Sequence, residues 1–190
     1  MYPPSYLKAI VIVHGKSEKI ICDYVKSNLK LKLGVVSDKR GEKSVQINGL
    51  LDFLKRMEFK DFDSFFQKYE NELPTRARKL PNDFKVFVIM DTDDCSDENK
   101  EAYMSSTLFK EHWLGDYIVP IYNINNLEDV MKKVGIPVKD KKDYIKIFPI
   151  NKSGSISNVK EIKNLSNMLK KHKDITNLPD FFDFCLDLLK

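Results

Sequence analysis

The sequence has few cysteines and no long apolar segment. Cys22, Cys95 and Cys185 are widely spaced and form no CxxC pair, so neither a disulfide framework nor a zinc site is predicted. No run approaches the roughly 18 uninterrupted apolar residues of a membrane helix. The first residues also lack the basic flank, apolar core and cleavage site of a secretory signal. We therefore expect free thiols and a cytoplasmic protein with no membrane contact.

Charge is distributed unevenly along the chain. The 190 residues carry a formal net charge of +4 and are 42% hydrophobic, which suits one globular domain. Between Val130 and Lys173, twelve lysines face three acidic residues, which gives a local charge of +9 and leaves −5 for the rest. This segment is either a face that binds a polyanion such as DNA or RNA, or a solvated helix surface. Arg76, Arg78 and Lys79 are read as a solvated turn, with phosphate contact as the alternative.

The stretch from Lys85 to Asp94, KVFVIMDTDD, is an apolar run that stops abruptly at acidic residues. Such a run predicts a strand buried on both faces, as in a parallel α/β sheet, where ligands gather at the carboxyl ends of the strands. Asp91 and Asp93 would point to the same side if the strand continued, which suits two oxygen ligands of one Mg²⁺. The alternative is a solvated turn in which Asp97 and Glu98 cap the next helix.

A second apolar run, from Leu7 to Val13, ends in His14-Gly15-Lys16-Ser17-Glu18. Gly15 permits a tight turn, Ser17 is a candidate N-cap, and the following residues repeat at helical spacing. This stretch is not a phosphate-binding P-loop, because that motif needs a glycine where this chain has Ile10. The stretch predicts strand, turn and helix.

The remaining pattern predicts an α/β fold: a mostly parallel four-stranded sheet with helices on both faces and additional C-terminal helices. The other two strands are expected at Leu31 to Val36 and at Tyr117 to Tyr122, where Pro120 argues for an edge or a bulge. A helix is expected from Glu98 to His112, and Ile136 to Ser157 is expected to be a mobile, Lys-bearing connection. We expect residues 1–135 to form the core, and 136–190 to form the Lys-rich connection and the helices that pack on it.

The two strand-end motifs together resemble the Toprim domain of topoisomerases, bacterial primases, small ribonucleases and OLD-family nucleases. The matching stretches are IVIVHGKSE (Ile10 to Glu18) and VFVIMDTDD (Val86 to Asp94). The resemblance implies phosphodiester chemistry on nucleic acid that depends on Mg²⁺ or Mn²⁺, with Asp91 and Asp93 on the metal. It also implies that Glu18 and Glu128 are further acidic ligands.

This chain departs from the Toprim pattern at its first acid, because His14 stands where the family has a glutamate. Three consequences are open. His14 takes over proton transfer, for which its ordinary pKa is suitable; Glu18 reaches the metal from the first helical turn; or the site binds without cutting. Catalytic candidates are thus His14, Glu18, Asp91 and Asp93, and candidate contacts to nucleic acid are Lys16, Lys39, Arg40 and Lys43.

Two other functions compete with a nuclease of a defence or mobile-element system. One is an inactive Toprim-like module that acts through nucleic acid, a protein partner or a second copy of itself. The other is a phosphatase of the haloacid dehalogenase type, because DTDD resembles its D-x-D nucleophile motif. That motif normally closes the first strand, whereas here a strand-helix unit and two further helices precede it.

Overall fold

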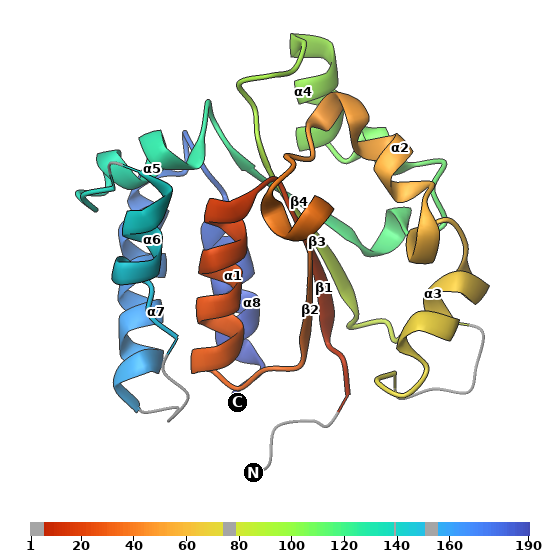
Figure 1. Ribbon diagram of the computed structural model, residues 1–190, viewed down its shortest axis with the longest axis horizontal. Helices are drawn as coiled ribbons and strands as arrows, with labels where there is room; N and C mark the ends of the chain where they lie inside the picture. The colour runs from red at the N-terminus through yellow and green to blue at the C-terminus, as the bar shows by residue number, and fades with distance from the viewer. Residues whose placement is uncertain (1–5, 74–78, 139, 151–155) are drawn as a thin grey trace.

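The computed structural model describes residues 6–73, 79–138, 140–150 and 156–190. It has an α/β fold built on a four-stranded parallel sheet, as the sequence predicted (Figure 1). The strands are β1 (Ala9–Val13), β2 (Leu33–Val36), β3 (Lys85–Asp91) and β4 (Ile118–Asn123). The α-helices are α1 (Lys16–Asn28), α2 (Leu50–Leu54), α3 (Phe62–Tyr69), α4 (Asp97–Met104), α5 (Leu127–Lys133), α6 (Lys141–Ile147), α7 (Ile156–Leu169) and α8 (Leu178–Asp187). Arg76 and Arg78 lie outside the described residues.

The sheet has the strand order β2-β1-β3-β4, and every neighbouring pair is parallel. β1 is buried along its whole length and β3 along all but its first residue, as expected for apolar runs in central strands. β4 lies at an edge, which confirms the inference from Pro120. The carboxyl ends of β1 and β3 are therefore next to each other.

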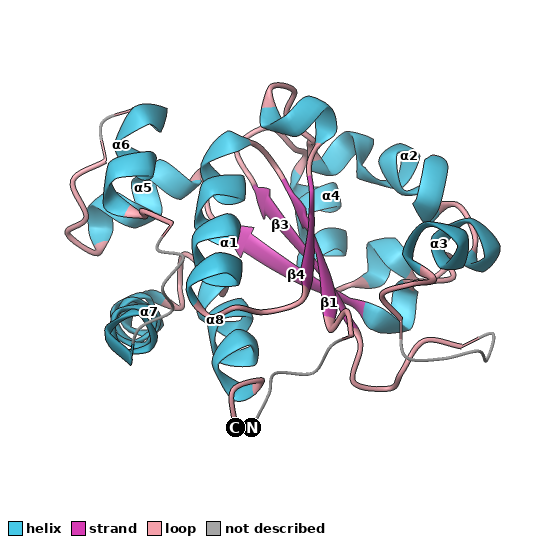
Figure 2. Ribbon diagram, turned by 60° about the horizontal axis from the view of Figure 1, so that its bottom comes forward, coloured by secondary structure: helices cyan, strands magenta, loops and turns pink. Residues whose placement is uncertain are grey.

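Helices cover both faces of the sheet and form two separate apolar cores (Figures 1 and 2). Alternate residues of each strand enter opposite cores, as the two-residue period of a strand requires. On one face Val11 and Ile89 pack under α1 and α5 to α8. On the other face Ile12 and Val88 pack under α2, α3 and α4 with most of the aromatic side chains. These aromatics belong to this core or pack against it.

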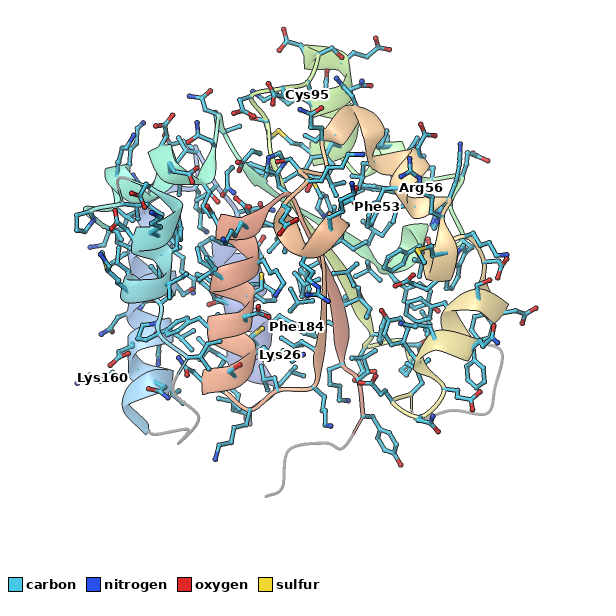
Figure 3. All side chains as sticks on the ribbon, viewed as in Figure 1. Lys26, Phe53, Arg56, Cys95, Lys160 and Phe184 are labelled. Carbon is cyan, nitrogen blue, oxygen red and sulfur yellow. The ribbon has the colours of Figure 1, made fainter. Side chains whose placement is uncertain are left out.

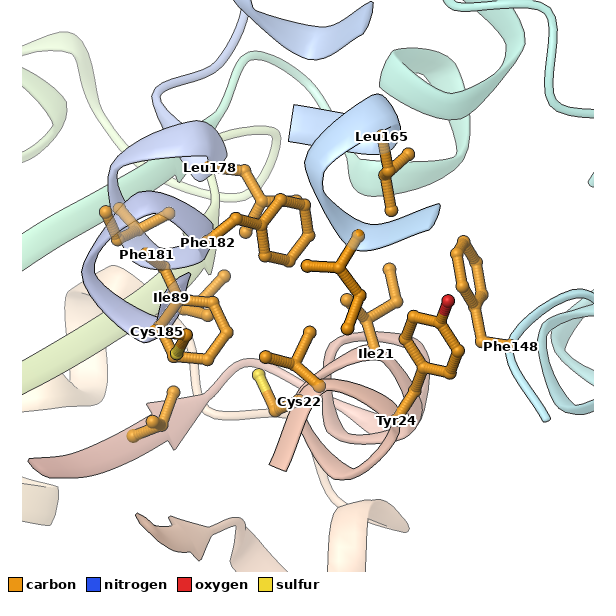
Figure 4. Packing of buried hydrophobic residues seen from close by; sticks show 14 of the residues in the cluster. Ile21, Cys22, Tyr24, Ile89, Phe148, Leu165, Leu178, Phe181, Phe182 and Cys185 are labelled. Atoms are coloured by element: carbon orange, nitrogen blue, oxygen red, sulfur yellow. The ribbon is translucent and has the colours of Figure 1, made fainter. Parts of the chain in front are cut away.

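The core between α1, α7 and α8 contains two of the three cysteines (Figure 4). Cys22 and Cys185 are buried among Ile21, Phe181 and Phe182, and neither forms a disulfide. Burial raises the pKa of both thiols well above the usual value. The predicted free thiols are confirmed, and these two are unreactive packing residues.

The predicted extent of one helix and the predicted character of one connection were wrong. The helix expected from Glu98 to His112 ends at Met104, because the Ser105 hydroxyl donates to the Glu101 carbonyl at 2.7 Å and Ser106 adopts a left-handed φ of 64°. The connection expected from Ile136 to Ser157 contains helix α6, whose N-cap is Asp140. None of the described helices is long and apolar enough to span a membrane.

The loop after β2 lies against the start of α1 through Gly41. Gly41 has a φ of +87°, and a Cβ there would lie 3.1 Å from the Cα of Lys16. Gly41→Ala should lower the free energy of unfolding by about 1 to 3 kcal/mol, since it combines left-handed backbone strain with a backbone clash. Gly49→Ala is the control, because nothing lies within 4 Å of a Cβ at that position. Urea unfolding measures both variants, and equal stabilities would contradict this packing.

Candidate functional site

The two strand-end motifs, Ile10 to Glu18 and Val86 to Asp94, meet at the carboxyl edge of the sheet. Val13 of β1 is in register with Ile89 of β3, and the His14 amide continues the ladder by donating to the Ile89 carbonyl at 2.8 Å. The turn that begins at His14 therefore lies at the same edge as Asp91, although 77 positions separate them in the sequence. This placement is the one that the strand pattern predicted.

Asp91, the last residue of β3, is a buried acid with 8% of its surface exposed. Its Oδ1 accepts hydrogen bonds from the Asn123 side-chain amide and from the Leu127 backbone N–H, both at 3.1 Å. Burial raises the pKa of this carboxyl to about 8; the nearby Glu18 carboxylate also raises it, whereas His14 and the Asn123 hydrogen bond lower it. Two hydrogen bonds therefore fix the position of the Asp91 carboxyl group, and its burial disfavours the ionised form.

Glu18 is 3% exposed and belongs to the first turn of α1. Its Oε2 accepts from the Gly15 backbone N–H at 3.0 Å, which makes Gly15 the N-cap of the helix in a capping box. The prediction of Ser17 as N-cap was therefore wrong. Ser17 is the second residue of the helix, and its hydroxyl donates to Glu128 Oε1 at 3.0 Å.

His14 is half-buried, and its ring has a defined tautomer. Its Nδ1 lies 2.8 Å from the Val45 carbonyl oxygen. Because a carbonyl oxygen can only accept, Nδ1 carries the proton of this hydrogen bond. In the neutral ring Nε2 then has a free lone pair, which can take a proton or bind a metal.

Glu128 is the second residue of α5, and its carboxylate acts on the hydroxyl of Tyr144 in α6. Burial raises the pKa of the Tyr144 hydroxyl, the carboxylates of Glu128, Glu18 and Asp91 raise it further, and a side-chain hydrogen bond with Ser17 lowers it. Three acids from different elements therefore surround one region, next to Ser17. The sequence analysis did not identify Asn123 or Tyr144 as residues of this region. Tyr144 belongs to α6, and the spacing of Asp140 and Asp143, which form the capping box of that helix, was the signal that could have located it.

Asp93 and Asp94 differ from Asp91 in being exposed. The strand geometry ends at Asp91, because the Thr92 amide donates to the carbonyls of Asn123 and Asn125. Asp94 Oδ2 accepts from Gln46 at 3.0 Å, and Ser96 caps α4, so part of the acidic turn does serve as a capped loop. Within the described ranges, no group of three or more His, Cys, Asp or Glu side chains is arranged to hold a metal ion.

The four predicted basic contacts are all exposed. Lys16 opens α1, and the loop with Lys39, Arg40 and Lys43 packs on that helix start through Gly41. Lys39 and Arg40 have left-handed φ angles of 43° and 60°, conformations that cost non-glycine residues roughly 1 to 2 kcal/mol each. Lys43 also lies 3.7 Å from Asp38.

The basic segment of the C-terminal part extends over α5, α6 and α7. Lys160 projects from the outer side of α7 (Figure 3), and the other exposed lysines on these helices are Lys132, Lys133, Lys142, Lys146 and Lys163. Lys139 and Lys152 lie outside the described residues. Figure 1 shows α5 and α6 beside α1, whereas Figure 3 shows Lys160 of α7 near the far end of α1, level with Lys26.

The raised pKa of Asp91 makes stability depend on pH. Between about pH 4 and about pH 8 the folded protein retains a proton that the unfolded chain has lost, so stability should fall as pH rises, by up to about 1.4 kcal/mol per pH unit. Asp91→Asn keeps an oxygen acceptor for Asn123 and Leu127 without the charge. It should be more stable than the wild type at about pH 8, with a flatter pH profile.

Urea unfolding at several pH values tests this prediction. Asp63→Asn is the control, because Asp63 is an exposed acid in the first turn of α3 and should leave the pH profile unchanged. A wild-type stability that rises from about pH 5 to about pH 8 would show that Asp91 ionises in the folded state as readily as in the unfolded chain.

Comparison with known proteins adds no relative to this description. No family model, curated protein or solved structure matches the chain.

Proposed function

We propose that the protein is a Toprim-like nuclease that uses Mg²⁺ or Mn²⁺ to cleave phosphodiester bonds in nucleic acid. The observation that carries this proposal is the meeting of Asp91, Glu18 and His14 at the carboxyl edge of a parallel sheet, the usual position of ligand sites in such folds. Two buried carboxylates beside a histidine form a set of groups suited to cation binding and proton transfer.

The chemistry of the site suits a hard divalent cation. Among the described residues the hydrogen bonds to Asp91 reach Oδ1 only, which leaves Oδ2 for a metal. Glu18 and Glu128 would supply further carboxylate oxygens, the ligands that Mg²⁺ prefers, and Asp93 would approach from the exposed side. When bound, the cation would neutralise charge on the phosphate.

His14 is the residue that we assign to proton transfer. Its Nδ1 proton is held by the Val45 carbonyl, so Nε2 is the atom that would accept a proton from an attacking water. His14 lies close enough to lower the pKa of Asp91, so an ionised Asp91 would face the imidazolium that results. Glu18 as a metal ligand would have to leave the Gly15 amide, which it currently caps.

Nucleic acid would be held by basic side chains on two sides of this edge. Lys16 lies at the start of α1, on which the loop with Arg40 packs through Gly41, and the exposed lysines of α5 and α6 lie on the other side of α1. Phosphate contacts of this type position the strand without reading its sequence. The free cysteines fit a reducing compartment, and we place the proposed activity in the cytoplasm.

The second candidate is a binding module that does not cut. It is favoured by the capping role of Glu18 and by the lack of a three-ligand metal group among the described residues. Such a module would act through nucleic acid, a protein partner or its own dimer. It predicts binding that weakens steeply with salt and no turnover with any metal.

Cleavage assays separate the two candidates. Purified wild type should cut plasmid DNA, single-stranded DNA or RNA in Mg²⁺ or Mn²⁺, and Asp91→Asn should reduce the rate at least about 100-fold, because the buried ligand charge is lost. His14→Gln should reduce it about 100-fold as well, because no proton acceptor is left at Nε2. The exposed Asp63→Asn variant should cut normally. Activity that survives Asp91→Asn rules out the proposal.

The salt dependence of nucleic-acid binding tests the roles of Lys16 and Arg40 without requiring cleavage. Lys16→Gln and Arg40→Gln should each weaken binding and lower the slope of log affinity against log salt by about 0.7 to 0.9. Lys60→Gln is the control, because Lys60 is exposed beside α3 and lies 3.7 Å from Asp61. If both test variants show the same slope as the wild type, Lys16 and Arg40 do not contact the nucleic acid.

A further inference from the structure

The two outer strands of the sheet differ in how their free edges are covered. The outer side of β4 is closed by the segment before α8, because the Asn177 side chain accepts from the Tyr122 amide at 2.8 Å and donates to the Pro120 carbonyl at 2.9 Å. Thr176 also forms a bridge with Asn123. Among the described residues, no strand or side chain hydrogen-bonds to the outer side of β2.

The uncovered edge of β2 is a template for another strand, because its outward N–H and C=O groups have no partner in the sheet. Proteins usually protect such an edge with a charge, a proline or a covering segment. The sequence of β2, LGVV, has neither charge nor proline, and only its length of four residues limits pairing.

A groove follows this edge. A space of about 410 Å³ lies along five consecutive residues, Leu33 to Ser37, between α1 and α3. A second space of about 310 Å³ continues it toward Phe53 and Met57, and the two share Val36 and Lys68 in their walls. We call the two spaces together the β2 groove. Since an extended chain rises about 3.3 Å per residue, the edge matches a partner segment of about five or six residues.

The two walls of the β2 groove differ in chemistry. Val35 is on the face of the sheet that packs under α1, where Lys26 lines the groove, whereas Val36 is on the other face, near Phe53. Figure 3 shows Lys26 and Phe53 on opposite sides of the sheet. Met57, next to Phe53 in the wall, is 79% exposed, and methionine is an adaptable contact residue. One wall is thus basic and the other largely apolar at this end.

The β2 groove as a whole carries an excess of positive charge. Among the described residues, six basic and three acidic side chains line it. Lys19 is paired with Asp23, but Lys26, Arg40 and Lys68 form no ion pair with a described residue. Unpaired cations beside an open strand edge are complementary to the carboxylates of an incoming chain.

A second copy of the chain does not have this complementarity. Two β2 strands paired antiparallel about a two-fold axis would keep both α1 helices on the same face of the joined sheet. Lys19 and Lys26 would then meet their own copies, and like charges would oppose the pairing. Nucleic acid lacks the peptide backbone that would extend the ladder. The groove therefore favours a peptide segment of a different protein.

We propose that the β2 groove binds an extended, acidic segment of a partner protein, which joins the sheet as a fifth strand beside β2. Successive side chains of a strand point to opposite faces, so alternate residues of the segment are acidic, toward Lys26, and apolar, toward Phe53 and Met57. Main-chain hydrogen bonds give such strand addition its affinity, and the alternate side chains give its specificity. The inference is independent of the proposed nuclease, because no residue of the catalytic set lines the groove.

A six-residue peptide that alternates glutamate and valine, with both ends blocked, is the probe that tests the inference. The wild type should bind it with a Kd below about 1 mM, and binding should slow hydrogen exchange of the outward β2 amides at least about 10-fold. Two versions of the peptide are N-methylated, each at the alternate amides that the other leaves free. Only alternate amides face the neighbouring strand, so one version should bind at least about 10-fold more weakly than the other.

Charge reversal tests the basic wall. Lys26→Glu should weaken binding of the peptide about 10-fold, and it should prefer a peptide in which lysine replaces glutamate. Lys110→Glu is the matched control, because Lys110 is exposed and does not line the β2 groove; it should bind as the wild type does.

Five results would overturn the inference. The first is that the wild type does not bind the peptide at all. The second is that the two methylated peptides bind alike or that the β2 amides exchange as before, which would show that the peptide is not a fifth strand. The third is that Lys26→Glu binds like the wild type, which would remove the acidic preference. The fourth is a dimer, measured by light scattering, whose β2 amides are protected without peptide, since a second copy would then occupy the edge. The fifth is protection of these amides by a single-stranded oligonucleotide in place of the peptide, which would assign the groove to nucleic acid.

Discussion

The hydrogen bonds to the Asp91 carboxylate determine how the edge of the sheet is built. Asn123 at the end of β4 and the first amide of α5 both donate to Oδ1. The Asn123 side-chain oxygen in turn accepts from Thr176, whose hydroxyl accepts from the Leu178 amide at the start of α8. Two strands and two helices are therefore joined by one buried polar chain. Such a chain is stabilising only while every member is satisfied, so it fixes where Asp91 can lie.

The position of the site was predictable because it follows from topology. Unbroken apolar runs specify central parallel strands, and parallel strands bring their carboxyl ends to one edge. The turn after β1 and the acid after β3 therefore had to meet, whatever the side-chain details. Pro120 located the edge strand for an equally direct reason, since it lacks the N–H that a central strand needs.

The identity of the interacting side chains was less predictable, because it depends on contacts between elements that are distant in sequence. Asp93 follows Asp91 by two residues, and the period of a strand would have placed both on one side. The Thr92 amide instead donates to the carbonyls of Asn123, the last residue of β4, and of Asn125, and Asp93 beyond it is exposed. Tyr144 was hidden for a similar reason, because a helix as short as α6 has too few turns to show a clear period.

The loop between β2 and α2 contacts two residues of the candidate site, His14 and Lys16. Its Val45 carbonyl fixes the tautomer of His14, and its Gly41, which follows the left-handed Lys39-Arg40 pair, packs against Lys16. One segment thus contacts both the His14 ring and the start of α1. Left-handed strain at two consecutive non-glycine residues persists only where surrounding structure holds it, and it is concentrated at functional sites. A module that only bound nucleic acid would need the charges, but it would not need the orientation of the His14 ring, and this difference favours the catalytic reading.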